Sequence, residues 1–240
     1  MNLNECTSAE VLENLSKNNS DAIKKEVASN VFSNEQTLEY LSKDKSYYIR
    51  GEVAKNKNTP LKVLIKLSKD RAVFVRKEVA KSTNDLNILK KLAKDKNNYV
   101  AELVIINSNA NNEILESFVT HKNKWCRAKL ASMNAPAYIL HQLTDDTEAT
   151  VLVRLSANVF SSAETLEKLY LMNVKFYKKT IMRNIVRNSS TPLELLIKLI
   201  KSRDLYTLDF LMEELNYRSQ PVVTPRHIIQ TIKYMIAYLT

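Results

Sequence analysis

The 240-residue chain carries 36 Lys and Arg against 26 Asp and Glu, for a net charge of +10, and it contains one glycine and two cysteines. So little glycine leaves few positions for hairpin turns or phosphate-cradling loops, which favours an all-helical chain. Cys6 and Cys126 form no CxxC pair, so we expect no metal centre, no disulfide framework and a reducing compartment.

The predicted elements recur along the chain with a fixed period. The last apolar position of each expected first helix falls at residue 15, 41, 67, 92, 118, 143 or 169, so the step is always 25 or 26 residues. A fixed period of this size is typical of solenoids, in which each unit contacts only its neighbours. The sequence therefore predicts an all-α, right-handed α-solenoid of about eight short two-helix repeats over residues 1–216.

Residues 58–82 illustrate one repeat. We expect Thr59 to cap the first helix and Pro60 to occupy its first position. The second helix is expected over residues 72–81. An asparagine such as Asn56 commonly closes the repeat, where it should tolerate left-handed backbone at the helix exit. Apolar residues at helical spacing should face the core, namely Val63, Leu64 and Leu67 from the first helix and Val75 and Val79 from the second.

Aspartate and arginine lie six residues apart in two repeats, as Asp44 with Arg50 and as Asp70 with Arg76. Such residues can form a ladder of bidentate pairs, each arginine reaching a carboxylate of its own or of the next repeat. Arg127 fits this ladder less well, because no aspartate lies six residues before it. An arginine row that awaits an anion is the alternative interpretation.

The period breaks near the C-terminus. In residues 217–240, Thr224 and Pro225 supply a helix start, and apolar residues follow at helical spacing from Ile228 to Leu239. Solenoids need a terminal element over the last open core face, so we expect a C-terminal capping helix here. A docking helix for a partner is the alternative.

One repeat carries the chain's resemblance to a known family. The run NKNTPLKVLIKLSKDRAVFVRKEVA, residues 56–80, resembles the repeat of the leucine-rich repeat variant (LRV) family, within the broader HEAT and armadillo-like class. The resemblance covers roughly residues 7–200. It implies an interaction protein, since such solenoids mostly bind proteins or nucleic acids. Some members carry a cysteine-rich iron–sulfur segment, but this chain lacks those cysteines, so no cofactor is expected.

An aromatic residue precedes the first core position of the second helix in four successive repeats. These are Tyr48, Phe74, Tyr99 and Trp125, and stacked repeats would align them as a column on which a partner would bind. Aromatic side chains among basic groups suit protein hot spots and single-stranded nucleic acid alike. The candidate partner-binding residues are Tyr48, Phe74, Lys77, Lys81, Tyr99, Trp125, Arg127, Lys129 and Arg154. The alternative is that each ring only covers the gap between adjacent helices.

The sequence contains no recognisable catalytic motif. We therefore expect a non-enzymatic protein-binding scaffold with no cofactor, no metal and no small-molecule substrate. The alternative is a sequence-tolerant nucleic-acid binder that uses the basic segments 51–100 and 151–200, whose net charges are +8 and +5. A DNA-alkylation glycosylase on a HEAT-like solenoid is a less favoured alternative. Steep salt dependence would indicate phosphate binding, and its absence a mainly apolar protein contact.

The sequence shows neither a signal-peptide pattern at its N-terminus nor an apolar run near the ~20 residues that span a bilayer. We therefore expect a cytoplasmic protein that does not engage a membrane.

Overall fold

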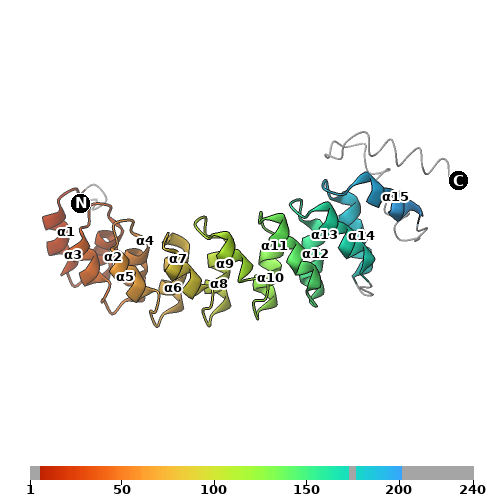
Figure 1. Cartoon of the computed structure of the whole chain (residues 1–240). Helices are drawn as coiled ribbons and strands as arrows, with labels where there is room; N and C mark the ends of the chain where they lie inside the picture. Colours follow the sequence, from red (N-terminus) through yellow and green to blue (C-terminus); the bar gives the residue numbers. More distant parts are fainter. Residues whose placement is uncertain (1–5, 173–176, 202–240) are drawn as a thin grey trace. The chain divides into compact units, whose positions relative to one another are not determined.

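The computed structural model describes residues 6–172 and 177–201, and over that part every element is helical. Short helices alternate along the chain in pairs (Figure 1). The chain divides after Phe118 into two compact units. Unit 1 contains α1 (Ala9–Ser16), α2 (Asp21–Ser29), α3 (Glu35–Leu41), α4 (Tyr47–Lys55), α5 (Leu61–Leu67), α6 (Val73–Ser82), α7 (Leu86–Leu92), α8 (Asn98–Ile105) and α9 (Asn112–Glu116). Unit 2 contains α10 (Lys124–Ala131), α11 (Ala137–Gln142), the 3-10 helix η2 (Leu143–Asp145), α12 (Ala149–Ala157), α13 (Ala163–Leu171), α14 (Lys178–Arg187) and α15 (Leu193–Lys201).

Each unit is built from repeats of a first and a second helix. In unit 1 the second helices α2, α4, α6 and α8 pack side by side, and each packs on the first helix of its own repeat, which is α1, α3, α5 or α7. In unit 2 the second helices α10, α12 and α14 form the corresponding row. The prediction of an α-solenoid of short two-helix repeats is therefore confirmed. The expected capping helix, residues 217–240, lies outside the described residues.

Most of the apolar residues that the helical periodicity places in the core are buried. Val63 and Leu67 from α5, and Val75 and Val79 from α6, are all buried. Ala80 is also fully buried, and its small side chain allows the neighbouring second helices to approach closely. Leu64 is only half-buried. A continuous strip of apolar side chains thus fills the space between the two helix layers.

The predicted cap of the first helix is wrong. Pro60, rather than Thr59, occupies the N-cap position of α5, and no side chain caps this end. The Thr59 hydroxyl instead donates to the carbonyl oxygen of Val53 at 2.5 Å, so it satisfies the end of the preceding second helix. The same buried hydroxyl-to-carbonyl bond, six residues back, recurs at Ser33, Ser161 and Thr191.

The closing asparagines also differ from the prediction. The Asn56 backbone is extended, with φ −70° and ψ 127°, and not left-handed. Its Nδ2 donates to the carbonyl oxygens of Ala28 and Asn30 in the preceding repeat, each at 2.8 Å, and its Oδ1 accepts from the Asn58 amide at 3.0 Å. Equivalent bridges to the preceding repeat are made by Asn107, Asn158 and Asn188. Asparagine recurs here because it links consecutive repeats.

The arginine ladder runs between repeats. Arg50 forms a two-pronged pair with Asp70 of the next repeat, from Nε to Oδ2 at 2.6 Å and from Nη2 to Oδ1 at 2.8 Å, and its Nη1 donates to the Asp44 carbonyl oxygen at 2.8 Å. Arg76 repeats this geometry with Asp95 at 2.7 and 2.9 Å. Both arginine side chains are nearly buried, so these pairs depend on the additional hydrogen bonds that compensate for lost hydration. The anion-seeking alternative is not supported for these residues.

The ladder holds its carboxylates in the charged form. Burial raises the pKa of Asp70. The hydrogen bonds from Arg50 and the Ala72 amide lower the pKa by more than burial raises it, so the pKa lies below the ordinary value. The pKa of Asp95 is lowered in the same way, with burial opposed by Arg76 and a backbone amide. Each of these aspartates therefore favours the folded chain when ionised.

We expect Leu67→Asp or Val79→Asp to lower the free energy of unfolding by several kcal/mol, on the order of 3–5, because either change buries an unpaired charge. Chemical denaturation followed by circular dichroism measures this. Ile65→Asp is the matched control, since Ile65 lies on α5 but is exposed. Equal denaturation midpoints for the buried and exposed variants would contradict the observed facing.

We also expect unit 1 to lose stability in acid. The folded-state pKa of Asp70 lies below the value of about 3.9 for an unfolded chain. The unfolded state therefore binds more protons than the folded state. The stability that ionised Asp70 contributes is complete at a pH above the unfolded-state pKa, and it is lost as the pH falls through the folded-state pKa. Asp70→Asn should reduce stability at neutral pH and flatten the loss below about pH 4. Glu116→Gln, at an exposed position on α9, should keep the wild-type profile. Identical pH profiles for Asp70→Asn and wild type would refute this role of the ladder.

Candidate functional site

Three aromatic side chains from two consecutive repeats gather at the start of their second helices. Tyr47 and Tyr48 begin α4, and Phe74 lies in the first turn of α6. The Phe74 ring meets both tyrosines edge-on, with centroid distances of 5.8 Å to Tyr47 and 5.5 Å to Tyr48. We call these three residues the aromatic cluster. Sequence reasoning missed Tyr47 because it considered one position per repeat, although the adjacent tyrosines were a visible signal.

Phe74 packs against the only glycine of the chain. A Cβ atom built on Gly51 would lie 2.4 Å from Cε1 of the Phe74 ring, well inside normal contact distance. Gly51 belongs to the preceding repeat, so the ring lies in the gap between two second helices, and it is half-buried there. For Phe74, the interpretation that the ring covers an inter-helix gap is correct.

Tyr48 and Tyr99 are far more exposed. Tyr48 retains 54% of its accessible surface and Tyr99 retains 67%. The residue one repeat after Gly51 is Lys77, and its side chain is half-buried. The Tyr99 ring therefore has no glycine below it to pack on, as the Phe74 ring has in Gly51. This difference explains why the Phe74 ring is packed while the Tyr99 ring stays in solvent.

Of the two predicted basic residues of α6, Lys77 and Lys81, the second forms an ion pair on its own helix. Lys81 pairs with the buried Glu78 at 3.1 Å, and in the preceding repeat Lys55 pairs with Glu52 at 2.9 Å. These pairs lie three residues apart on their own helices, so the C-terminal halves of α4 and α6 carry alternating signs and little net charge.

In unit 2 the structure corrects the interpretation of Arg127. Its Nε donates to Oδ2 of Asp146 at 2.6 Å, and its Nη1 donates to the carbonyl oxygen of His121 at 2.7 Å. Arg127 is thus a ladder arginine whose aspartate lies in the following repeat, and it is not available as the seed of an anion site. The sequence prediction failed because it looked for the partner six residues upstream.

The other unit 2 candidates are scattered over two helices. Trp125 is 51% exposed on α10, with the Lys124 ammonium 5.9 Å from its ring centroid. Lys129 is half-buried on α10, and Arg154 is exposed on α12. Unit 1 therefore brings together the more concentrated aromatic surface.

Two further searches covered the described part of the chain. Nowhere in residues 6–172 and 177–201 do three or more His, Cys, Asp or Glu side chains gather in a way that could hold a metal ion. Among the helices of these same ranges, none combines the length and apolar character needed to cross a bilayer.

Comparison with known proteins gives one informative likeness. No family model and no curated protein matches the sequence. Among solved structures, the chain is similar to one described as "a leucine-rich repeat variant with a novel repetitive protein structural motif", with a TM-score of 0.57 and 22% identity over 74% of this chain and 71% of that chain. The helical repeats and inter-repeat ladders thus define an α-solenoid repeat protein. Its fold is, more specifically, like that of the leucine-rich repeat variant, as the sequence resemblance predicted.

The contact between Phe74 and Gly51 can be tested by a double-mutant cycle. Replacing glycine by alanine inside a helix normally stabilises by roughly 0.5–1 kcal/mol. We expect Gly51→Ala to lack this gain in the wild-type chain, because the new methyl group displaces the Phe74 ring, and to regain it in the Phe74→Ala background. Urea unfolding of the four proteins gives a coupling energy, expected to exceed about 0.5 kcal/mol. Additive effects would show that the ring does not pack on Gly51.

Proposed function

We propose that this protein is a non-enzymatic scaffold that binds another protein through the second-helix surface of unit 1. The observation that carries the proposal is the group of rings formed by Tyr47, Tyr48 and Phe74, followed one repeat later by the exposed Tyr99. Tyrosine rings on rigid helices offer a large contact area at small entropic cost, and they are enriched in protein interfaces.

The use of the recurring polar residues supports this proposal. The ladder aspartates and arginines bond to each other, and the closing asparagines bond to carbonyl oxygens of the preceding repeat. Their recurrence is therefore explained by the stack itself. The exposed tyrosines are not needed to fill the core, because the buried Ile49 and Val100 already occupy the core positions next to Tyr48 and Tyr99. Exposed rings that the core does not require are the residues expected at an interaction site.

The charges beside the rings favour a protein over a polyanion at this site. Lys55 with Glu52 and Lys81 with Glu78 compensate each other. A phosphate chain that ran from the rings toward the C-terminal ends of α4 and α6 would meet carboxylates as often as ammonium groups. A protein interface with an aromatic centre and a mixed-charge rim matches this arrangement.

The test removes two exposed rings of the second-helix surface together and compares the result with removal of an exposed ring elsewhere in unit 1. We expect Tyr48→Ala with Tyr99→Ala to weaken partner binding by more than about 2 kcal/mol, roughly thirty-fold, with little loss of folding stability. Partners are captured from a nuclease-treated lysate of the native host, identified, and then titrated by calorimetry.

Tyr40→Ala is the matched control, because Tyr40 is 51% exposed but lies on the first helix α3. Its affinity should stay within about threefold of wild type. Unchanged binding by the Tyr48 and Tyr99 double variant would refute the proposed surface.

A further inference from the structure

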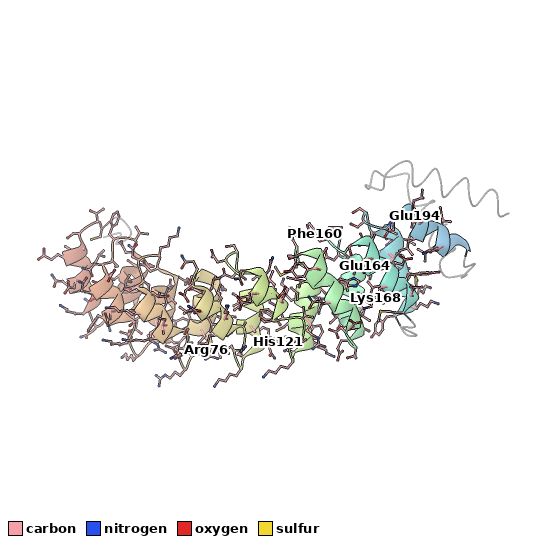
Figure 2. The ribbon with its side chains drawn as sticks, viewed as in Figure 1. Arg76, His121, Phe160, Glu164, Lys168 and Glu194 are labelled. Carbon is pink, nitrogen blue, oxygen red and sulfur yellow. The ribbon has the colours of Figure 1, made fainter. Side chains whose placement is uncertain are left out.

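A row of basic side chains follows the turns between the first and second helices of unit 1. Asp44, Asp70 and Asp95 each lie in such a turn, and each stands between two exposed basic residues. The six are Lys43 and Lys45, Lys69 and Arg71, and Lys94 and Lys96, which we call the turn-edge cations. They share the edge at which the Arg76 guanidinium meets the Asp70 and Asp95 turns (Arg76 is labelled in Figure 2).

The aspartates at this edge are already engaged. Asp44 pairs with Lys24 at 2.8 Å, while Asp70 and Asp95 each bind the arginine of the preceding repeat. In the described part of the chain none of the turn-edge cations makes an ion pair within 4.0 Å of a carboxylate, although the aspartates contribute attraction at longer range. Lys24, Arg50 and Arg76 neutralise the three aspartates. The six turn-edge cations therefore add a charge of +6 to one edge of unit 1.

Lys91, in the last turn of α7, lies near the turn-edge cation Lys69. Burial lowers the pKa of Lys91, and the nearby charge of Lys69 lowers it further. Exposed lysines elsewhere in unit 1 do find carboxylates, as Lys62 does with Glu39 at 2.7 Å. Like charges held together without a counter-ion form a local positive potential that an incoming anion would relieve.

The spacing of the cations indicates the kind of anion. One basic pair recurs in three successive repeats of unit 1, at the same place in the turn, because the repeat fixes the position of the aspartate between them. The first repeat lacks the pattern, since Lys17 and Asn19 flank Asn18 there. Regularly spaced cations match a polymer with regularly spaced anionic groups better than an acidic peptide, whose charges follow no fixed interval. In unit 2 the pattern is absent at the corresponding turns, where Thr120 and Lys122 flank His121, and Asp145 and Thr147 flank Asp146.

We propose that the turn-edge cations of unit 1 bind the phosphate backbone of a nucleic acid along the turns that precede the second helices, through contacts that do not use the rings of the aromatic cluster. Contacts to phosphate position a nucleic acid without reading its sequence, so binding should be sequence-tolerant. This surface covers only part of the basic segment 51–100 and extends before it to Lys43. In the segment 151–200, Lys168 and Lys198 are paired with carboxylates, which makes that segment the weaker candidate.

Fluorescence anisotropy with a labelled oligothymidine of about 20 nucleotides, and with a duplex of the same length, tests the proposal. Between about 50 and 200 mM salt, log K should fall linearly with log salt, with a slope between about −2 and −4 for three to six phosphate contacts on a single strand. Binding of either probe with this slope supports the proposal. A slope near zero would overturn it.

Two variants with the same loss of charge locate the surface. Lys69→Gln, Arg71→Gln, Lys94→Gln and Lys96→Gln together should weaken binding at least tenfold and flatten the salt slope by about two units. Lys55→Gln, Lys57→Gln, Lys62→Gln and Lys81→Gln, from the opposite edge of the same unit, should change affinity less than about threefold. Both variants should show wild-type circular dichroism and melting. Equal losses in the two would mean that net charge alone attracts the nucleic acid, and the proposed surface would be wrong.

Two further measurements separate this surface from other possibilities. Polyglutamate of similar charge should compete much less well than unlabelled oligothymidine, and equal competition would indicate an acidic protein segment instead. The variant with Tyr48→Ala and Tyr99→Ala should keep its affinity for oligothymidine. Loss of that affinity would contradict binding through contacts that do not use the rings, whereas loss of protein binding alone would leave the nucleic-acid proposal intact.

Discussion

The shortness of its helices is the constraint on which this structure depends. A helix such as α5 has seven residues, and every α-helix leaves about four amide and four carbonyl groups unsatisfied at its ends. More than half of the backbone amide and carbonyl groups of α5 are therefore end groups. Burial of such ends is costly unless other groups bond to them. The recurring polar side chains meet this need, and in doing so they join each repeat to the next.

Each recurring residue completes a particular helix end. Asp70 accepts from the Ala72 amide just before α6, and Arg76 donates to the Asp70 carbonyl oxygen. The Asn56 amide bridges to carbonyl oxygens of the preceding repeat, and the Thr59 hydroxyl covers the Val53 carbonyl oxygen. These bonds fix the register of the stack. They also fix where the residues between them emerge, which places the turn-edge cations in a row and aromatic residues at the start of α4, α6 and α8.

Sequence reasoning identified the repeat, its boundaries and its core because these depend on local spacing. The positions of Leu67, Val75 and Val79 follow from helical periodicity alone, and all three are buried as expected. The capping predictions for Thr59 and Asn56 failed for one shared reason. Capping rules consider a helix end in isolation, whereas here the end is completed by side chains or carbonyl oxygens of a neighbouring segment.

The sequence by itself determined the period, the helical class and the likeness to the leucine-rich repeat variant, because these arise from patterns within about 26 residues. The tertiary structure alone decided which residues meet across that distance. Arg127 has its aspartate in the following repeat, and Phe74 settles on Gly51 of the preceding one while Tyr99 stays exposed. Such contacts depend on how closely and in what register neighbouring second helices pack, and that geometry exists only once the repeats have stacked.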